Sequence, residues 1–173
     1  IRFSPSVRVA SLEHITPRPH VVLDRPGVVL KQESAALVGN TELSEEDDDM
    51  LMHELSFCDL VVCGPSTIAL DAIFFDKPVV LIDCYDRPMK DFEKIPLWGY
   101  EHFQFVIKQQ AIAVARSKDE LLAHIGDALK NPSGLAEGRR KVREAFCGNT
   151  DGRSGERMAS SILKALDPRT HAT

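Results

Sequence analysis

The stretch Asp59-Leu-Val-Val-Cys-Gly-Pro-Ser-Thr-Ile-Ala-Leu-Asp-Ala-Ile-Phe-Phe-Asp-Lys-Pro-Val-Val-Leu-Ile82 decides the fold of this chain. Residues 60–63 form a short apolar run, Gly64-Pro65 predicts a turn, and the residues after this turn favour a helix. Lys77-Pro78 predicts the end of the helix, and a second β-branched run follows at residues 79–82. This order is typical of the βαβ unit of a parallel sheet. Because neither strand alternates apolar with polar residues, we expect helices on both faces of the sheet.

The chemistry predicted for this unit lies at the turn after the first strand. Ser66 or Thr67 can cap the helix, and the free amides and positive dipole end there form an anion site. Asp71 follows Thr67 by one helical turn, on the same face and about 6 Å along the axis. This spacing suits a nucleotide whose diphosphate meets the helix start and whose ribose meets Asp71. A carboxylate that only reaches the surface between packed neighbours is the alternative interpretation of Asp71.

A hydroxyl residue after Gly64-Pro65, an acid at position 71 and Lys77-Pro78 at the helix end resemble the donor-binding half of GT-B glycosyltransferases. The relatives of these enzymes include UDP-N-acetylglucosamine 2-epimerases and CDP-glycerol glycerophosphotransferases of surface-polymer synthesis. The resemblance implies that Asp71 binds the nucleotide ribose. It also implies that the donor phosphates are bound by Gly64, Ser66 and Thr67.

A second segment, Asp151-Gly152-Arg153-Ser154-Gly155-Glu156-Arg157-Met158, is similar to the segment that opens the C-terminal helix in the same families. The two matches have the expected order and together cover about residues 48–166. The resemblance implies that four residues of this segment contact the phosphates or support the groups that do, namely Asp151, Gly152, Arg153 and Arg157.

The resemblance also implies the fold class and the domain organisation. The expected fold is α/β, a Rossmann-like open parallel sheet with helices on both faces, and it is one half of a GT-B architecture. We expect residues 1–173 to form a single nucleotide-donor-binding domain, with the N-terminal acceptor half outside this chain. The general base would belong to that other half, so no catalytic residue is assigned and the isolated domain is expected to be inactive.

Composition narrows the partners and the compartment. A net charge of −5 argues against nucleic-acid binding, which needs a basic surface. The apolar span at residues 60–82 carries charges that disfavour a membrane helix. No CxxC spacing or His/Cys cluster indicates a metal, and the cysteines are expected to be reduced thiols of a cytoplasmic protein. The four cysteines are Cys58, Cys63, Cys84 and Cys147.

Three further groups of residues are weaker candidates for a site. Asp83, Tyr85 and Asp86 follow the second strand, at the edge where open α/β sheets bind ligands, and a surface turn is the competing interpretation. The aromatic residues of 98–103 are expected in a loop, where they favour either stacking on a base or an acceptor or packing against the C-terminal helix. The third group is a basic cluster on a predicted helix. It indicates either a solvated helix face or a contact with phosphates or lipid head groups, and it consists of Arg139, Arg140, Lys141 and Arg143.

Further elements are predicted from local signals. Residues 21–23 and 111–115 are strand candidates, and an acidic helix is expected to begin after Ser44. The pair Ser117 and Glu120 forms a capping box for another helix. A final helix is expected to begin at Arg157.

Three functions remain open from the sequence. The first is a GT-B-type transferase that moves a sugar or glycerophosphate-like group from a nucleotide-sugar or CDP-activated donor, with no cofactor and no required metal. In it the helix end, helped by Arg153 or Arg157, stabilises the leaving nucleotide phosphate. The second is a UDP-N-acetylglucosamine 2-epimerase, and the third is a non-catalytic Rossmann-like module that binds a nucleotide or a partner. Peripheral membrane association of the parent enzyme is left open.

Overall fold

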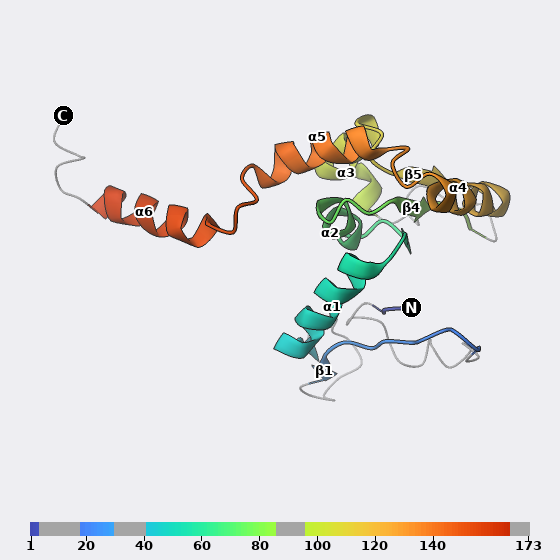
Figure 1. Cartoon of the computed structure of the whole chain (residues 1–173), viewed down its shortest axis with the longest axis horizontal. Helices are drawn as coiled ribbons and strands as arrows, with labels where there is room; N and C mark the ends of the chain where they lie inside the picture. The colour runs from blue at the N-terminus through green and yellow to red at the C-terminus, as the bar shows by residue number, and fades with distance from the viewer. Residues whose placement is uncertain (4–17, 30–40, 86–95, 167–173) are drawn as a thin grey trace. The chain divides into compact units, whose positions relative to one another are not determined.

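The computed structural model describes residues 1–3, 18–29, 41–85 and 96–166 (Figure 1). The fold is α/β, with a Rossmann-like open parallel sheet flanked by helices, as the sequence predicts. The chain separates into two compact units, Ile1–Phe57 and Cys58–Thr173. The expectation that residues 1–173 form a single domain stays a prediction. None of the described helices is both long and apolar enough to cross a bilayer.

The parallel sheet belongs to the second unit and has the order β3-β4-β5 in the described residues. Strand β3 (Val61–Cys63), helix α2 (Ile68–Phe74) and strand β4 (Val79–Ile82) form the predicted βαβ unit. Strand β5 (Ala113–Ala115) pairs with the other side of β4 and confirms the last predicted strand. The unit forms because its apolar runs are separated by a turn and a helix of the length that a parallel crossover requires.

Burial differs between the strands because, of the three described strands of this sheet, β4 is the central one. Val79, Val80 and Leu81 of β4 are buried, as expected for a strand covered on both faces. Strand β3 lies at the edge of the described sheet, and its Val62 is 39% exposed. The expectation that both strands are covered on both faces is therefore wrong for β3. Strand order depends on residues far along the chain, so the local pattern of β3 does not reveal it.

Helices cover the sheet and one another within the second unit (Figure 1). Helix α2 contacts β3 and β4, α4 contacts β4 and β5, and α5 contacts α2 and α3. The predicted cap of α4 is confirmed, since the Ser117 hydroxyl accepts a hydrogen bond from the Glu120 amide at 3.1 Å. The remaining elements of this unit are η3 (Pro96–Gly99), α3 (Glu101–Lys108), α4 (Lys118–Lys130), α5 (Ala136–Cys147) and α6 (Ser154–Leu166).

Helix α5 approaches the backbone between α3 and β5 at Gly138. A Cβ atom added there would lie 2.5 Å from the Gln110 carbonyl oxygen and still closer to that of Gln109. Only a residue without a side chain allows two backbones to meet in this way. Gly138 thereby lets α5 bury Arg139 and Val142 beside it.

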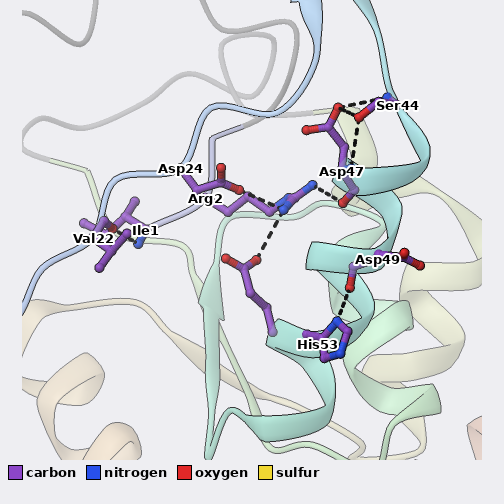
Figure 2. A network of polar contacts seen from close by, with 9 residues as sticks. Ile1, Arg2, Val22, Asp24, Ser44, Asp47, Asp49 and His53 are labelled. Atoms are coloured by element: carbon purple, nitrogen blue, oxygen red, sulfur yellow. Dashed lines mark hydrogen bonds and ion pairs between the residues drawn. The ribbon is translucent and has the colours of Figure 1, made fainter.

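The first unit contains helix α1 (Glu45–Phe57) and an antiparallel pair of short strands, β1 (Val28–Val29) and β2 (Thr41–Glu42). The predicted acidic helix start is confirmed by a reciprocal cap (Figure 2). The Asp47 amide donates to the Ser44 hydroxyl at 3.1 Å, and the Ser44 amide donates to the Asp47 carboxylate at 2.9 Å. Two backbone amides at the start of α1 thus find their acceptors in one pair of side chains.

The strand predicted at residues 21–23 is wrong, because only an isolated parallel bridge between Arg2 and Asp24 forms there. Figure 2 shows what holds this segment instead. The Arg2 guanidinium binds the Asp24 carboxylate at 2.7 Å and donates to the Asp47 carbonyl of α1 at 2.8 Å. Glu54 of the same helix lies 3.5 Å from Arg2. Backbone hydrogen bonds join the same segments, from the Asp24 amide to the Ile1 carbonyl at 2.8 Å and from the Phe3 amide to the Asp24 carbonyl at 3.0 Å. Arg2 adds the side-chain bonds to Asp24 and to helix α1.

Candidate functional site

The predicted donor site is the turn between β3 and α2. Helix α2 begins at Ile68, and Thr67 before it has φ −59° and ψ −22°, which are already helical angles. A side-chain cap needs extended angles at that position, so the Thr67 hydroxyl makes no capping bond. The predicted cap by Ser66 or Thr67 is therefore wrong, since neither hydroxyl accepts a bond from a described residue.

Three backbone amides at this turn nevertheless have no acceptor in the part of the chain that the structure describes. The first bonds of the helix run from the Ala69 amide to the Ser66 carbonyl at 3.0 Å and from the Leu70 amide to the Thr67 carbonyl at 2.8 Å. Among the described residues, the amides of Ser66, Thr67 and Ile68 have no acceptor. Unpaired amides at a helix start can bind the oxygen atoms of an anion.

Asp71 lies one turn farther along α2 and is half-buried. No hydrogen bond or ion pair to its carboxylate forms within the described part of the chain. Burial alone raises the pKa of Asp71 above its usual value. The carboxylate is thus not enclosed in the core, and no described residue neutralises it.

The raised pKa of Asp71 predicts a pH-dependent cost to stability. A carboxyl group whose folded pKa is raised favours folding in its protonated form, and this contribution is lost as the pH rises through the folded pKa. We therefore expect Asp71→Asn to be slightly more stable than the unmodified chain at pH 7 and equal to it near pH 3. Urea denaturation at the two pH values measures this. A variant that is less stable at pH 7 would show that Asp71 has a stabilising partner.

Cys63 ends β3 immediately before this turn. Burial raises the pKa of its thiol to about 11, so the thiol stays protonated at neutral pH. Gly64, the next residue, is half-buried at the end of the strand. In the described residues no group of three or more His, Cys, Asp and Glu side chains is arranged to hold a metal ion.

The second predicted segment binds mainly to itself. The Arg157 guanidinium donates to both oxygens of Asp151, at 2.9 and 3.0 Å, and the Arg153 amide donates to Asp151 at 3.0 Å. The bond from the Arg153 amide and that from Arg157 lower the pKa of Asp151. Arg153 also pairs with Glu156, and Gly152 has a φ of 74°, which suits a turn. The segment is therefore a self-capped entry to α6.

No hydrogen bond or ion pair joins residues 151–157 to residues 64–71 in the described structure. A role for Arg153 or Arg157 at the donor phosphates requires that each exchange its own acidic partner for the ligand. That role stays a prediction.

Asp83 and Tyr85, two of the candidates predicted after β4, lie at the carboxyl edge of the sheet. Because β3 and β4 are parallel, the turn after Cys63 and the residues after Ile82 lie at one edge of the sheet. The Asp83 amide extends the sheet by donating to the Ala115 carbonyl at 2.8 Å. Asp83 is half-buried and Tyr85 is exposed, whereas Asp86 lies outside the described residues.

The aromatic side chains of residues 98–103 differ in burial. The predicted loop is instead the short helix η3 followed by α3. Phe103 is completely buried in the core, so it cannot stack on a base. Tyr100 is half exposed and its ring lies 5.7 Å from that of His102. Phe103 therefore packs in the core, whereas packing against the C-terminal helix and a stacking role for Trp98 or Tyr100 stay predictions.

The prediction of a solvated face for the basic cluster of α5 is wrong for Arg139, which is buried, and is confirmed for the exposed Arg140 and Lys141. Arg139 is only 2% exposed, and its Nε donates to the Asp76 carboxylate at 2.9 Å. Arg143 binds the same carboxylate at 2.7 Å. The other two cations lie on the surface and bind acids of their own helix: Arg140 pairs with Glu137 and Glu144, and Lys141 pairs with Glu137.

Asp76 is the residue that sequence reasoning missed. It follows α2 with a φ of 58°, a left-handed angle that aspartate tolerates better than most residues. Burial acts to raise the pKa of Asp76, but hydrogen bonds from Arg143 and Arg139 outweigh it and the pKa is lowered. Its partners are 63 and 67 residues away, so no local signal identifies the pair.

No protein-family model, no curated protein and no solved structure matches this chain. The resemblance to GT-B enzymes therefore rests on the two sequence motifs and on the fold.

Proposed function

We propose that this chain carries the nucleotide-donor site of a GT-B-type transferase. The enzyme would move a sugar or glycerophosphate-like group from a nucleotide-activated donor to a surface-polysaccharide or related acceptor. The observation that carries the proposal is the carboxylate of Asp71, unpartnered among the described residues and one turn from the three free amides at the start of α2. This pairing offers donors to a diphosphate and an acceptor to ribose hydroxyls on the ligand-binding edge of an α/β sheet.

The chemistry follows from the charges at this edge. The donor diphosphate accepts hydrogen bonds from the amides of Ser66, Thr67 and Ile68, and the exposed Thr67 hydroxyl adds a further donor. As the bond to the transferred group breaks, negative charge grows on the nucleotide phosphate. Preorganised amides and the positive end of α2 stabilise that charge more strongly than water does.

Other parts of the proposal concern the parent enzyme. A general base for the acceptor belongs to a second half of the enzyme, and no residue of this chain is assigned that role. The parent enzyme works in the cytoplasm, where nucleotide-activated donors are made, and it acts at or near a membrane when its acceptor is membrane-bound. It needs no resident cofactor.

Binding of nucleotide diphosphates tests the donor site directly. Titration calorimetry with UDP and CDP is expected to show saturable binding, and Asp71→Asn is expected to weaken it about 10- to 100-fold. A hydrogen bond to a charged group contributes roughly 1.5–3 kcal/mol, which corresponds to this range. The variant keeps the shape of the side chain and removes only its charge.

Asp59→Asn is the matched control, because Asp59 is an exposed acid just before β3, at the opposite end of that strand. It is expected to bind UDP and CDP like the unmodified chain. Equal binding by Asp71→Asn would remove Asp71 from the ribose site. Exchange of solvent deuterium into C2 of a UDP-N-acetylhexosamine by the parent enzyme would instead identify an epimerase.

A further inference from the structure

A cavity of about 610 Å³ lies at the edge of the sheet opposite the β3–α2 turn. Its lining includes Val79 and Ala113, the first residues of β4 and β5, and the last turns of α4. Because the proposed donor site lies at the carboxyl ends of the parallel strands, this cavity at their amino ends is a separate place. Its volume is within the range of small-molecule sites in proteins.

The cavity has an apolar floor and a polar rim. Pro78, Val79 and Val80 at the start of β4 are buried and form part of the floor with Ile112. Polar side chains from the last turns of α4 line the other side, among them Asp127 and Lys130. Sites of this kind bind ligands with an apolar body and a small number of polar groups.

Arg139 supplies a fixed cation to this lining. Its Nε donates to Asp76 at 2.9 Å and its Nη2 donates to the Pro132 carbonyl at 2.8 Å, so the guanidinium is held from two sides. Its Nη1 has no hydrogen-bond partner among the described residues, and the side chain is 3% exposed. A guanidinium that is buried, held and still able to donate is preorganised for an anionic group.

The charges around the cavity favour a ligand with one negative charge. Arg139 and Arg143 share the single carboxylate of Asp76, which leaves one positive charge in that group. On the rim, the positive charge of Lys130 and the negative charge of Asp127 add up to zero. The positive end of α5, which begins next to the lining residue Leu135, also favours an anion.

We propose that this cavity binds a small monocarboxylate with an apolar body. The carboxylate accepts a hydrogen bond from Nη1 of Arg139, and the body packs against Val80 and Ile112. A carboxylate fits a guanidinium better than a neutral acceptor does, and its single charge matches the surplus of the arginine group. The site does not depend on the proposed transferase function, because none of its lining residues belongs to the β3–α2 turn.

Phenylacetate is a suitable probe, and its neutral analogue phenylacetamide is the matched control ligand. We expect phenylacetate to cause saturable amide shifts in the NMR spectrum of the full chain, concentrated at the lining residues of β4, β5 and α4. Phenylacetamide, which has the same shape, is expected to bind about tenfold more weakly, since it loses one charge-assisted hydrogen bond. Equal affinity for the two ligands, or no saturable shift with phenylacetate, would overturn the proposal.

Variants that spare the buried arginine locate the site. Ala128→Phe places a large side chain in the cavity and is expected to abolish phenylacetate binding. Lys130→Gln removes a rim cation and is expected to weaken binding about twofold to fivefold, whereas Lys118→Gln, at the other end of α4, leaves it unchanged. Asp71→Asn is also expected to leave it unchanged. Full binding by Ala128→Phe would place the ligand elsewhere, and the comparison of the two ligands remains decisive should that variant fold poorly.

Discussion

Gly138→Ala is expected to destabilise the second unit by at least about 2 kcal/mol, although alanine is the better helix former. The helix gains about 1 kcal/mol from the exchange, but the new Cβ meets the carbonyl oxygens of Gln109 and Gln110 at impossible distances. Because these atoms belong to the backbone, the clash cannot be relieved by turning a side chain. Either α5 must move away or the turn before β5 must deform.

Gly126→Ala is the matched control for this prediction. Gly126 lies within α4, and a Cβ added there meets nothing within 4 Å. This variant is expected to gain about 0.5–1 kcal/mol, so the two glycine replacements should differ in sign. Urea denaturation followed by circular dichroism measures both. Similar gains in the two variants would show that α5 does not approach the α3–β5 backbone as closely as described.

Asp76→Asn is expected to cost about 2 kcal/mol of stability. The change removes the charge that Arg139 and Arg143 share, and it leaves the buried Arg139 with a neutral partner. Water limits the loss, because half of the Asp76 side chain is exposed. Asparagine tolerates the left-handed angle at this position, so the variant isolates the charge from the backbone effect.

Two comparisons sharpen this measurement. Glu144→Gln removes a surface partner of Arg140 and is expected to cost less than about 0.5 kcal/mol. The contribution of Asp76 is also pH-dependent, because its pKa is lowered below the usual value of 3.8. It is present above the unfolded pKa and is lost as the pH falls through the folded pKa, so the difference between Asp76→Asn and the unmodified chain should shrink below about pH 4. A difference that persists there would assign the cost to shape rather than charge.

Local patterns predicted the elements of this fold well, since their causes are local. The helix start after Ser44 and the capping box of Ser117 and Glu120 depend on residues within a few positions of each other. The strands β3, β4 and β5 are visible as local apolar runs, although they pair with one another across longer stretches of sequence. The strand predicted at 21–23 is wrong because a strand needs a partner of some length, and here a single backbone bridge between Arg2 and Asp24 forms. The exposure of Val62 likewise depends on which strand takes the edge.

In the candidate site, too, local spacing predicted some features, and contacts between distant residues decided the others. Helical spacing was enough to place Asp71 one turn beyond the helix start, at the correct edge of the sheet. It could not show that Thr67 has helical angles, which prevent its hydroxyl from capping the helix. The pairing of Asp76 with Arg139 and the cavity beside it depend on how α4 and α5 meet the sheet, and no motif records that arrangement.

The position of β3 has a practical consequence for shortened versions of this chain. In the described sheet it forms its ladder with β4 alone, so the other side of its backbone has no paired strand. Such a side readily accepts a strand from another molecule, and an apolar residue at its centre makes self-association easier. Val62 is that central residue, and a lysine there would be the simplest protection for a fragment prepared at the concentrations that crystallisation requires.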